Sequence, residues 1–283
     1  MDVAVAADEP STGSWWRILL IGLGLFVLSV IIFALTGNPN LFPTVALIGN
    51  FLVPVSYVAF FYERRHMSQV TLVSTARAFL YGGVLGVFAA ALLEPVFIRR
   101  LTIVSVFEVG FIEEFAKILG VLVVARHHRH DSEIDGLILG GAAGMGFAAL
   151  ESSGYVFTAF VQSGGSLNAL VEVTLLRGLL SPVGHGTWTA ILASVLFREG
   201  AQTRFRINGA VIGAYVTVAV LHGLWDGLPQ VIAALTGSGL DVFLGQGVVG
   251  VAGLIILWRR WREAVRRQAA EGGPPLAAAT SGF

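Results

Sequence analysis

Long apolar stretches alternate with short polar segments along the whole chain. About eight of these stretches contain the roughly 20 mostly apolar residues that a helix needs to cross a bilayer. The sequence therefore predicts an all-α fold, a polytopic transmembrane helical bundle. We expect the spanning helices at about residues 16–35, 41–62, 76–97, 101–125, 135–161, a sixth that follows a break at Ser181-Pro182 and ends near Phe197, 207–235 and 242–258.

The polar segments predict the domain organisation and the orientation. We expect an N-terminal tail over residues 1–15, the transmembrane domain over 16–258, and a C-terminal tail over 259–283 that is first basic and then, from Gln268, disordered. Segments 63–66, 126–133 and 198–206 and the stretch RRWREAVRR are basic, whereas 37–40, 163–166 and 236–240 contain no basic residue. By the positive-inside rule, both termini are predicted to face the cytoplasm.

Composition supports a membrane protein and excludes several function classes. Only 13% of the 283 residues are charged, whereas soluble proteins average about 25%. The formal net charge is zero, so no basic surface for nucleic acid is implied. The absence of cysteine excludes disulfides and thiol chemistry. The first apolar stretch lacks a clear small-residue cleavage site, so we interpret it as a retained helix.

The segment GFIEEFAK, residues 110–117, places charged side chains inside an apolar stretch. It contains Glu113, Glu114 and Lys117, the only lysine of the chain. Each buried charge at a helix centre costs roughly 2.5–3.5 kcal/mol. On a helix, both glutamates can reach Lys117, at i+4 and i+3. This pattern fits either a general base held ready by an ammonium group or a buried ion pair that locks two helices together.

Three further predicted helices each bring ionisable residues into apolar surroundings. Glu151 has no partner within its own helix, so it must find one on a neighbouring helix or in trapped water. His185 lies in HGTWT, and HGLWD places His222 and Asp226 four residues apart. The last pair resembles the spacing of zinc-binding helices, although Asp226 could also orient the His222 imidazole. Because four successive helices contribute such groups, a shared hydrophilic cavity is the better explanation.

These segments together resemble the PrsW-type intramembrane proteases. EEFAK matches the EExxK motif of that family, Phe147 and Glu151 match FxxxE in a block that opens at Asp135, and HGTWTA and HGLWD resemble its third and fourth blocks. The CAAX-prenyl-protease membrane proteins are more distant relatives. The resemblance implies peptide-bond hydrolysis within or near the membrane. A family member cleaves a membrane-anchored anti-sigma factor, and the wider relatives are interpreted as metal-free glutamate peptidases or as metalloproteases.

Our hypothesis is an intramembrane endopeptidase of the cytoplasmic membrane with its catalytic core at about 101–235. A buried glutamate, Glu113 rather than Glu114, activates a water molecule with or without a divalent metal. The residues whose side chains offer nitrogen or oxygen ligands suited to zinc are Glu151, His185, His222 and Asp226. The expected partners are the lipid bilayer and a membrane-anchored protein substrate. The complete set of predicted catalytic residues is Glu113, Glu114, Lys117, Glu151, His185, His222 and Asp226.

Two other functions account for parts of the same pattern. An ion- or proton-coupled transporter also uses buried Glu, Lys, His and Asp side chains as a relay. The short repeat HGTW and HGLW is compatible with an internally repeated transporter, although the flanking residues do not match. A non-catalytic membrane scaffold is the third possibility, and the complete set of polar motifs counts against it.

Overall fold

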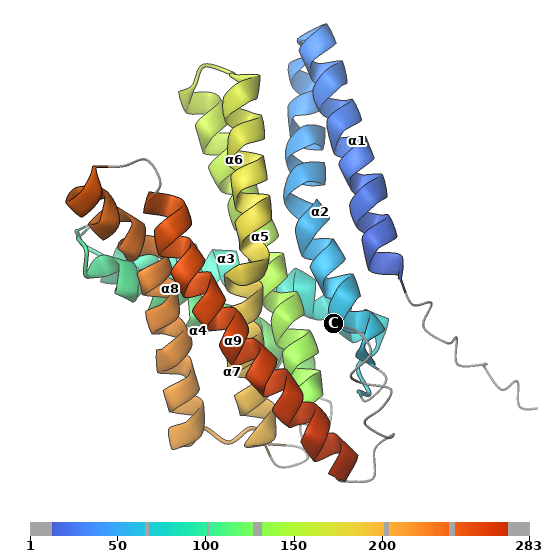
Figure 1. The fold of residues 1–283 in the computed structure, drawn as a ribbon, viewed down its shortest axis with the longest axis vertical. Coiled ribbons are helices and arrows are strands. Elements are labelled where there is room, and N and C mark those ends of the chain that lie inside the picture. Colours follow the sequence, from blue (N-terminus) through green and yellow to red (C-terminus); the bar gives the residue numbers. More distant parts are fainter. Residues whose placement is uncertain are drawn as a thin grey trace, which may run out of the picture.

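The computed structural model describes residues 13–65, 68–100, 102–126, 132–200, 204–237 and 241–270. All regular structure in these residues is helical, which confirms the predicted all-α bundle (Figure 1). The helices are α1 (Ser14–Thr36), η1 (Pro39–Leu41), α2 (Phe42–Glu63), α3 (Leu72–Phe97), α4 (Ser105–Ala125), α5 (Glu133–Gln162), α6 (Leu167–Leu180), η3 (Ser181–Val183), α7 (His185–Arg198), α8 (Gly209–Thr236) and α9 (Asp241–Ala270).

The helix boundaries confirm one feature of the sequence pattern and differ from it at two others. The break at Ser181-Pro182 is confirmed, because η3 separates α6 from α7 there. Helix α4 begins at Ser105, where the Thr102 and Ser105 side chains each accept a hydrogen bond from the other's backbone N–H, at 3.2 and 2.9 Å. Helix α9 continues to Ala270, so the prediction that the tail is disordered from Gln268 onward is wrong for residues 268–270. Residues 1–12 and 271–283 lie outside the described residues.

Within the described residues, seven helical segments are long and apolar enough to cross a membrane, by length and composition. In that count α6, η3 and α7 form one segment, Leu167–Arg198. The prediction was about eight. Helix α4 is long enough, but its 21 residues include Glu108, Glu113, Glu114 and Lys117, which lower its apolar character. The chain is a multi-pass membrane protein in which the most polar helix carries the charged motif.

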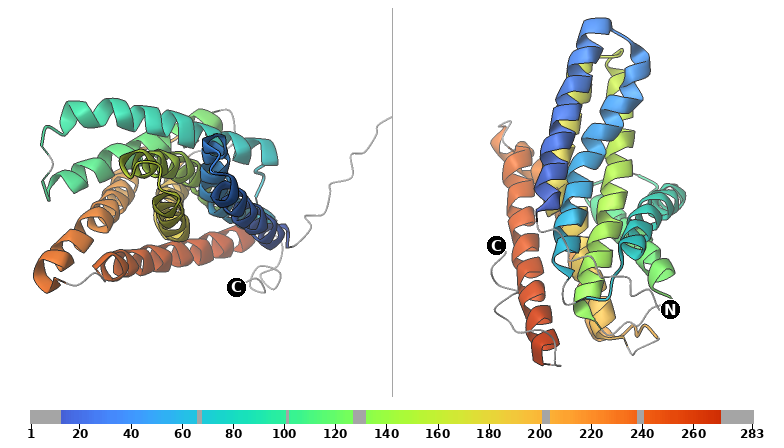
Figure 2. Two further views of the ribbon diagram at one scale, coloured as in Figure 1. Left: turned by 90° about the horizontal axis from the view of Figure 1, so that it is seen from above. Right: turned by 90° about the vertical axis from the view of Figure 1, so that its right-hand side faces the viewer.

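Helix α5 occupies the centre of the bundle. Its side chains are buried from Glu133 to Ala149, and it packs against α2, α3, α6 and α7. Helices α3 and α4 lie side by side and cross the bundle at a steep angle. In the view from above, α3 and α4 are seen lengthwise, whereas α1, α5 and α6 are seen nearly end-on (Figure 2). In contrast, α1 lies at the edge and presents apolar side chains outward, as expected of a lipid-facing helix.

Glycine permits the close crossing of α3 and α5. A Cβ atom on Gly146 would lie 1.9 Å from the carbonyl oxygen of Phe79, and one on Gly82 would lie 2.4 Å from the Cα of Ala143. Small residues at such positions let helix backbones approach in a membrane. The crossing matters for function because Phe147, one residue beyond Gly146, contacts the Lys117 ammonium.

We therefore expect Gly146→Ala to destabilise the protein by about 1–3 kcal/mol, because the added methyl group forces α3 away from α5. The matched control is Gly154→Ala in the same helix, where no atom lies within 4 Å of the added Cβ. Unfolding of the purified variants in mixed detergent measures both effects. Equal stability of the two variants would contradict this role for the crossing.

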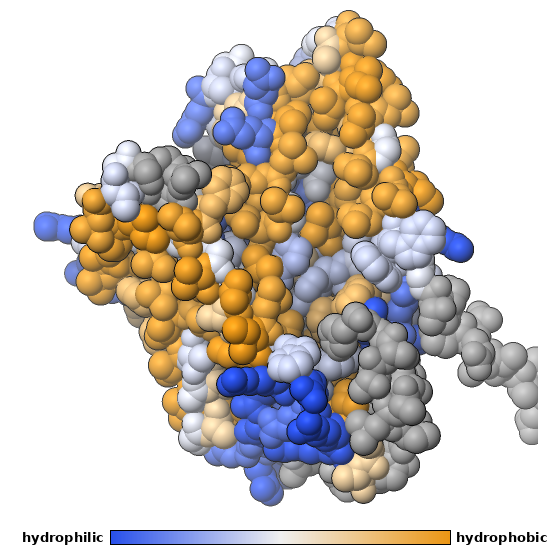
Figure 3. All heavy atoms as spheres, in the orientation of Figure 1, coloured by the Kyte–Doolittle hydropathy of each residue, from blue (hydrophilic) through white to orange (hydrophobic). Residues whose placement is uncertain are grey.

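Hydrophilic side chains gather at one end of the molecule. The C-terminal ends of α7 and α9 and the N-terminal ends of α5 and α8 all lie in the lower part of Figure 1, whereas the α1–α2 and α5–α6 turns lie at the top. Apolar side chains cover most of the visible face above the lower end of α9, where a hydrophilic patch begins (Figure 3). The helix ends that adjoin the basic segments therefore lie together.

Candidate active site

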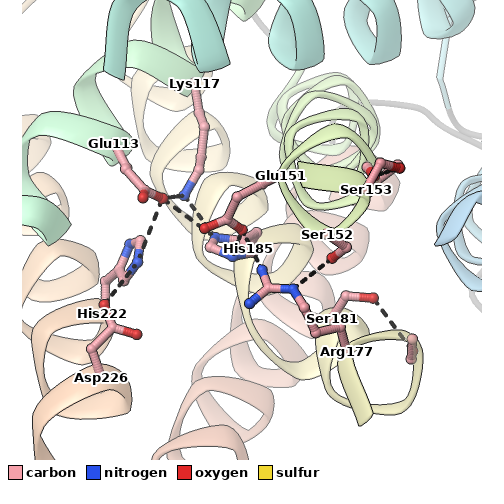
Figure 4. Close-up of polar contacts among 12 residues, drawn as sticks. Glu113, Lys117, Glu151, Ser152, Ser153, Arg177, Ser181, His185, His222 and Asp226 are labelled. Atoms are coloured by element: carbon pink, nitrogen blue, oxygen red, sulfur yellow. Dashed lines mark hydrogen bonds and ion pairs between the residues drawn. The ribbon is translucent and has the colours of Figure 1, made fainter. Parts of the chain in front are cut away.

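Lys117 of α4 lies at the centre of a buried polar cluster and is completely shielded from solvent (Figure 4). Its Nζ atom is 3.1 Å from Glu113 Oε2 and 2.8 Å from Glu114 Oε1, as the helical spacing predicts. The ammonium also lies 4.3 Å from the centre of the Phe147 ring, a cation–π contact. The lysine thus connects two carboxylates of its own helix with α5.

His185, the first residue of α7, connects Lys117 to Glu151. Its Nδ1 atom is 2.7 Å from Lys117 Nζ, and its Nε2 atom is 3.1 Å from Glu151 Oε2. An ammonium only donates hydrogen bonds, so Nδ1 is the acceptor and Nε2 carries the proton that is donated to Glu151. The two contacts therefore fix the orientation of the ring. The break at η3 allows α7 to begin at this depth.

Glu151 finds the partner on a neighbouring helix that its isolated position required. Arg177 of α6 donates from Nη2 to Glu151 Oε2 at 2.5 Å and from Nε to the Ser152 hydroxyl at 2.9 Å. Its guanidinium also lies over the Tyr155 ring at 4.2 Å. Three contacts to α5 hold Arg177 in place, and Arg177 in turn holds the carboxylate that faces His185.

His222 of α8 completes the cluster on the opposite side. Its Nδ1 atom is 3.1 Å from Glu114 Oε1, so Nδ1 donates to this carboxylate. Its Nε2 atom lies 3.6 Å from Glu113 Oε2 and 3.6 Å from Asp226 Oδ2, so three carboxylates surround the ring. Asp226 is the most exposed of the four carboxylates, with 36% of its side chain accessible. The cluster therefore opens toward solvent or lipid on the Asp226 side.

The two adjacent glutamates have different surroundings. Glu114 is completely buried and accepts hydrogen bonds from Lys117, His222 and, at 3.2 Å, the Thr189 hydroxyl. Glu113 has one hydrogen bond, from Lys117, and its Oε2 faces the Nε2 side of His222. Glu114 is saturated by donors, whereas Glu113 retains capacity to accept a proton or bind a cation.

Glu113, His185 and His222 could together hold a metal ion. Each offers one ligand atom, and these atoms lie within 4.8 Å of one another. This set differs from the predicted ligand set, because Glu151 and Asp226 are not part of it. Glu151 instead pairs with Arg177, and Asp226 lies beyond the imidazole of His222.

The charge and the donor types of the cluster fit a divalent cation. Its ionisable groups are four carboxylates and two cationic side chains, so with neutral histidines the formal charge is −2. One carboxylate and two imidazoles are also a ligand set that zinc accepts. In addition, the second nitrogen of each imidazole meets a carboxylate, as is usual for histidines that bind metal.

Sequence comparison relates this chain to a known protein family. A sequence model of the family described as PrsW family intramembrane metalloprotease matches residues 71–258, which is well over half of the chain. The chain belongs to the PrsW family. It is therefore a membrane protease, and the transporter and scaffold alternatives find no support in this match.

Two curated relatives are each named Protease PrsW. The one from Halalkalibacterium halodurans is 27% identical over 179 residues, which cover 62% of this chain and 78% of that protein. The one from Oceanobacillus iheyensis is 23% identical over 121 residues, 42% of this chain and 51% of that protein. No solved structure matches the chain significantly.

Two contacts of the PrsW site were missed by the motifs. Arg177 lies outside the four blocks, although it is the only lysine or arginine between residues 134 and 197, which was a signal that it has a buried partner. Thr189 was visible as the last residue of HGTWT, but nothing in the sequence indicated that its hydroxyl donates to Glu114.

Proposed function

We propose that this PrsW protein hydrolyses a peptide bond of a membrane-anchored protein and that Glu113 is the reactive carboxylate. The observation that carries this proposal is the contrast between the two adjacent glutamates. Glu114 is saturated by three donors, whereas Glu113 accepts a hydrogen bond from Lys117 alone among the described residues, and its Oε2 lies 3.6 Å from His222 Nε2. A carboxylate with unused acceptor capacity beside an imidazole is suited to take a proton from water.

The surrounding residues support this role. The Lys117 ammonium, 3.1 Å away, favours the ionised form of Glu113, which is the form that accepts a proton. Asp226, on the open side of the cluster, orients the attacking water beside His222 Nε2. His185 is held by Glu151 and accepts from the Lys117 ammonium, whose positive charge stabilises the negative charge that develops on the peptide oxygen. Glu113 gives this proton to the amide nitrogen as the tetrahedral state collapses, so that the C–N bond breaks and the amine leaves neutral.

A divalent metal fits the same site, and Glu113, His185 and His222 would hold it. When bound, such an ion polarises the peptide carbonyl and lowers the pKa of a coordinated water. Lys117 contacts two of these three residues, at Glu113 Oε2 and His185 Nδ1. Metal binding through His185 Nδ1 therefore requires that the ammonium withdraw from this nitrogen, since both use the same lone pair.

The orientation follows from the basic segments. We propose that the end carrying the basic segments, the lower end in Figure 1, faces the cytoplasm of a cell membrane, with both termini on that side. In this orientation we infer that Glu113 lies inside the bilayer region, within reach of a substrate segment that enters from the membrane.

Cleavage of a membrane-anchored reporter by the purified protein tests this function. We expect the wild type to cleave, and His222→Ala to lose at least about a hundredfold in rate, because Glu113 loses its partner. Arg99→Gln, an exposed residue between α3 and α4, is the control and should cleave normally. The proposal is refuted if the wild-type protein cleaves no membrane-anchored reporter, or if the His222→Ala variant is fully active.

The metal is tested on the same preparation by elemental analysis. If it takes part, active protein contains about one transition metal ion per chain, a chelator abolishes cleavage, and His185→Ala lowers both metal content and activity. Activity that persists without metal and despite chelator would leave Glu113 as a metal-free general base.

A further inference from the structure

A groove lies between α2 and α9, apart from the buried polar cluster. It has a volume of about 280 Å³, and the residues that line it are almost all aromatic or aliphatic. Phe60 and Phe61 come from α2, and Leu254 and Leu257 from α9. The rings of Phe61 and Trp261 meet edge-to-face, with centroids 5.6 Å apart, and join the two helices. None of the active-site residues lines this groove, so the cleavage chemistry does not explain it.

Guanidinium groups stand at the rim of the groove. Arg64 lines it directly, lies over the Phe60 ring at 3.4 Å and donates from Nη1 to the Phe60 carbonyl at 2.9 Å. On the α9 side, Arg262 lies over the ring of Trp258, a lining residue, at 4.7 Å. Stacking on rings holds the arginines in place at the edge of an apolar slot. Guanidinium is also the side-chain group best suited to bidentate binding of phosphate.

The end of α9 carries more positive charge than its own acidic partners neutralise. Residues 258–267 include five arginines and one glutamate. The inward-facing Arg260 pairs with Glu133 and Glu263, at 3.6 and 3.3 Å, and Arg267 also contacts Glu263. Of these five arginines, Arg259, Arg262 and Arg266 are exposed and form no ion pair within the described part of the chain. The end of α9 that carries these arginines lies where Figure 3 shows a hydrophilic patch.

We propose that this groove binds an anionic phospholipid, with an acyl chain between α2 and α9 and the phosphate at Arg64 and Arg262. A soluble phosphate compound would need the arginines but not the apolar slot. A zwitterionic lipid would need the slot but not the surplus of positive charge. Only an anionic lipid uses both features. Anionic head groups also bind to arginine clusters that directly follow a spanning helix and to basic pockets between helices.

The position of the groove agrees with a lipid ligand. Trp258 and Trp261 lie where the apolar part of α9 passes into its basic end, the depth at which tryptophan is enriched at membrane interfaces. The outward-facing Leu254 and Trp258 leave the groove accessible from the lipid side. This site is independent of the proposed cleavage chemistry.

Native mass spectrometry of the full-length protein in detergent tests the charge requirement. Phosphatidylglycerol and phosphatidylcholine with the same acyl chains are titrated separately. We expect phosphatidylglycerol to bind at least about tenfold more tightly, and the double variant Arg64→Gln, Arg262→Gln to reduce that difference to about twofold. The matched control, Arg99→Gln with Arg100→Gln, removes two exposed arginines between α3 and α4 and should bind as the wild type does.

The apolar slot is tested with the arginines intact. Leu254→Trp fills the groove from an exposed position, so the fold should tolerate it, and the melting temperature verifies this. We expect phosphatidylglycerol binding to fall about tenfold, whereas Val248→Trp, an exposed position on α9 outside the groove, should leave it unchanged. Equal binding of both lipids to the wild type, undiminished binding to the arginine variant or to Leu254→Trp, or full competition by soluble glycerol phosphate would overturn the proposal.

Discussion

Glu113→Gln is expected to lower the rate of peptide-bond hydrolysis by about 10²–10⁴-fold while the protein stays folded. The amide keeps the shape of the side chain and can still accept the hydrogen bond from Lys117, but it can neither take a proton from water nor bind a cation as a carboxylate does. The charge of Lys117 remains balanced by Glu114, 2.8 Å away. We therefore expect this variant to change the rate of hydrolysis and to leave the stability of the fold unchanged.

Glu114→Gln should have the opposite profile. It removes the carboxylate charge nearest to the Lys117 ammonium, and it also removes the charged group to which His222 and Thr189 donate. The side chains of all four residues are completely or almost completely buried. Breaking a buried ion pair by removing one partner costs about 3–5 kcal/mol. We expect low yield and a clearly lower melting temperature, with activity lost in proportion to folded protein.

The comparison needs both measurements on both variants, with Glu108→Gln as the control. Glu108 is an exposed glutamate in the first turn of the same helix, and its replacement should change neither property. Cleavage of the membrane-anchored reporter per mole of folded protein gives the activity, and detergent unfolding gives the stability. If Glu114→Gln is stable and inactive while Glu113→Gln still cleaves, the roles of the two glutamates are reversed.

The local part of this site was predictable because the helical period fixes it. The contacts of Lys117 with both glutamates, at i+3 and i+4, follow from spacing alone, as does the nearness of His222 and Asp226. The break before α7 was also predictable locally, because proline in the Ser181-Pro182 pair interrupts a helix.

The remaining contacts join residues that are far apart in the sequence. Lys117 and His185 are separated by 68 positions, and His222 and Glu114 by 108. Their meeting depends on the rotation of each helix and on the steep crossing of α3 and α4 over α5, which apolar composition does not encode. For this reason the sequence could not show that Glu113, rather than Glu151, faces both histidines.

Arg177→Met is expected to lower kcat by about 10–100-fold while KM stays nearly unchanged. Arg177 makes no contact with Glu113 or His222 in the described structure. It acts through Glu151, whose carboxylate it holds at 2.5 Å and which in turn accepts from His185 Nε2 at 3.1 Å. Without the guanidinium, Glu151 loses the partner that fixes its position, and the His185 ring loses its fixed orientation. Arg177 is thus a positioning residue.

Conservative variants separate positioning from simple packing. Arg177→Lys keeps the charge but not the fork that reaches Glu151 and Ser152 together, so it should restore only part of kcat. Ser152→Ala removes one of the two hydrogen-bond acceptors and leaves the Glu151 contact, so its kcat should fall by less than that of Arg177→Met. A loss of stability that is equal in the three variants and accounts for all lost activity would show that Arg177 only joins α6 to α5. A rise in KM at constant kcat would place it instead in substrate binding.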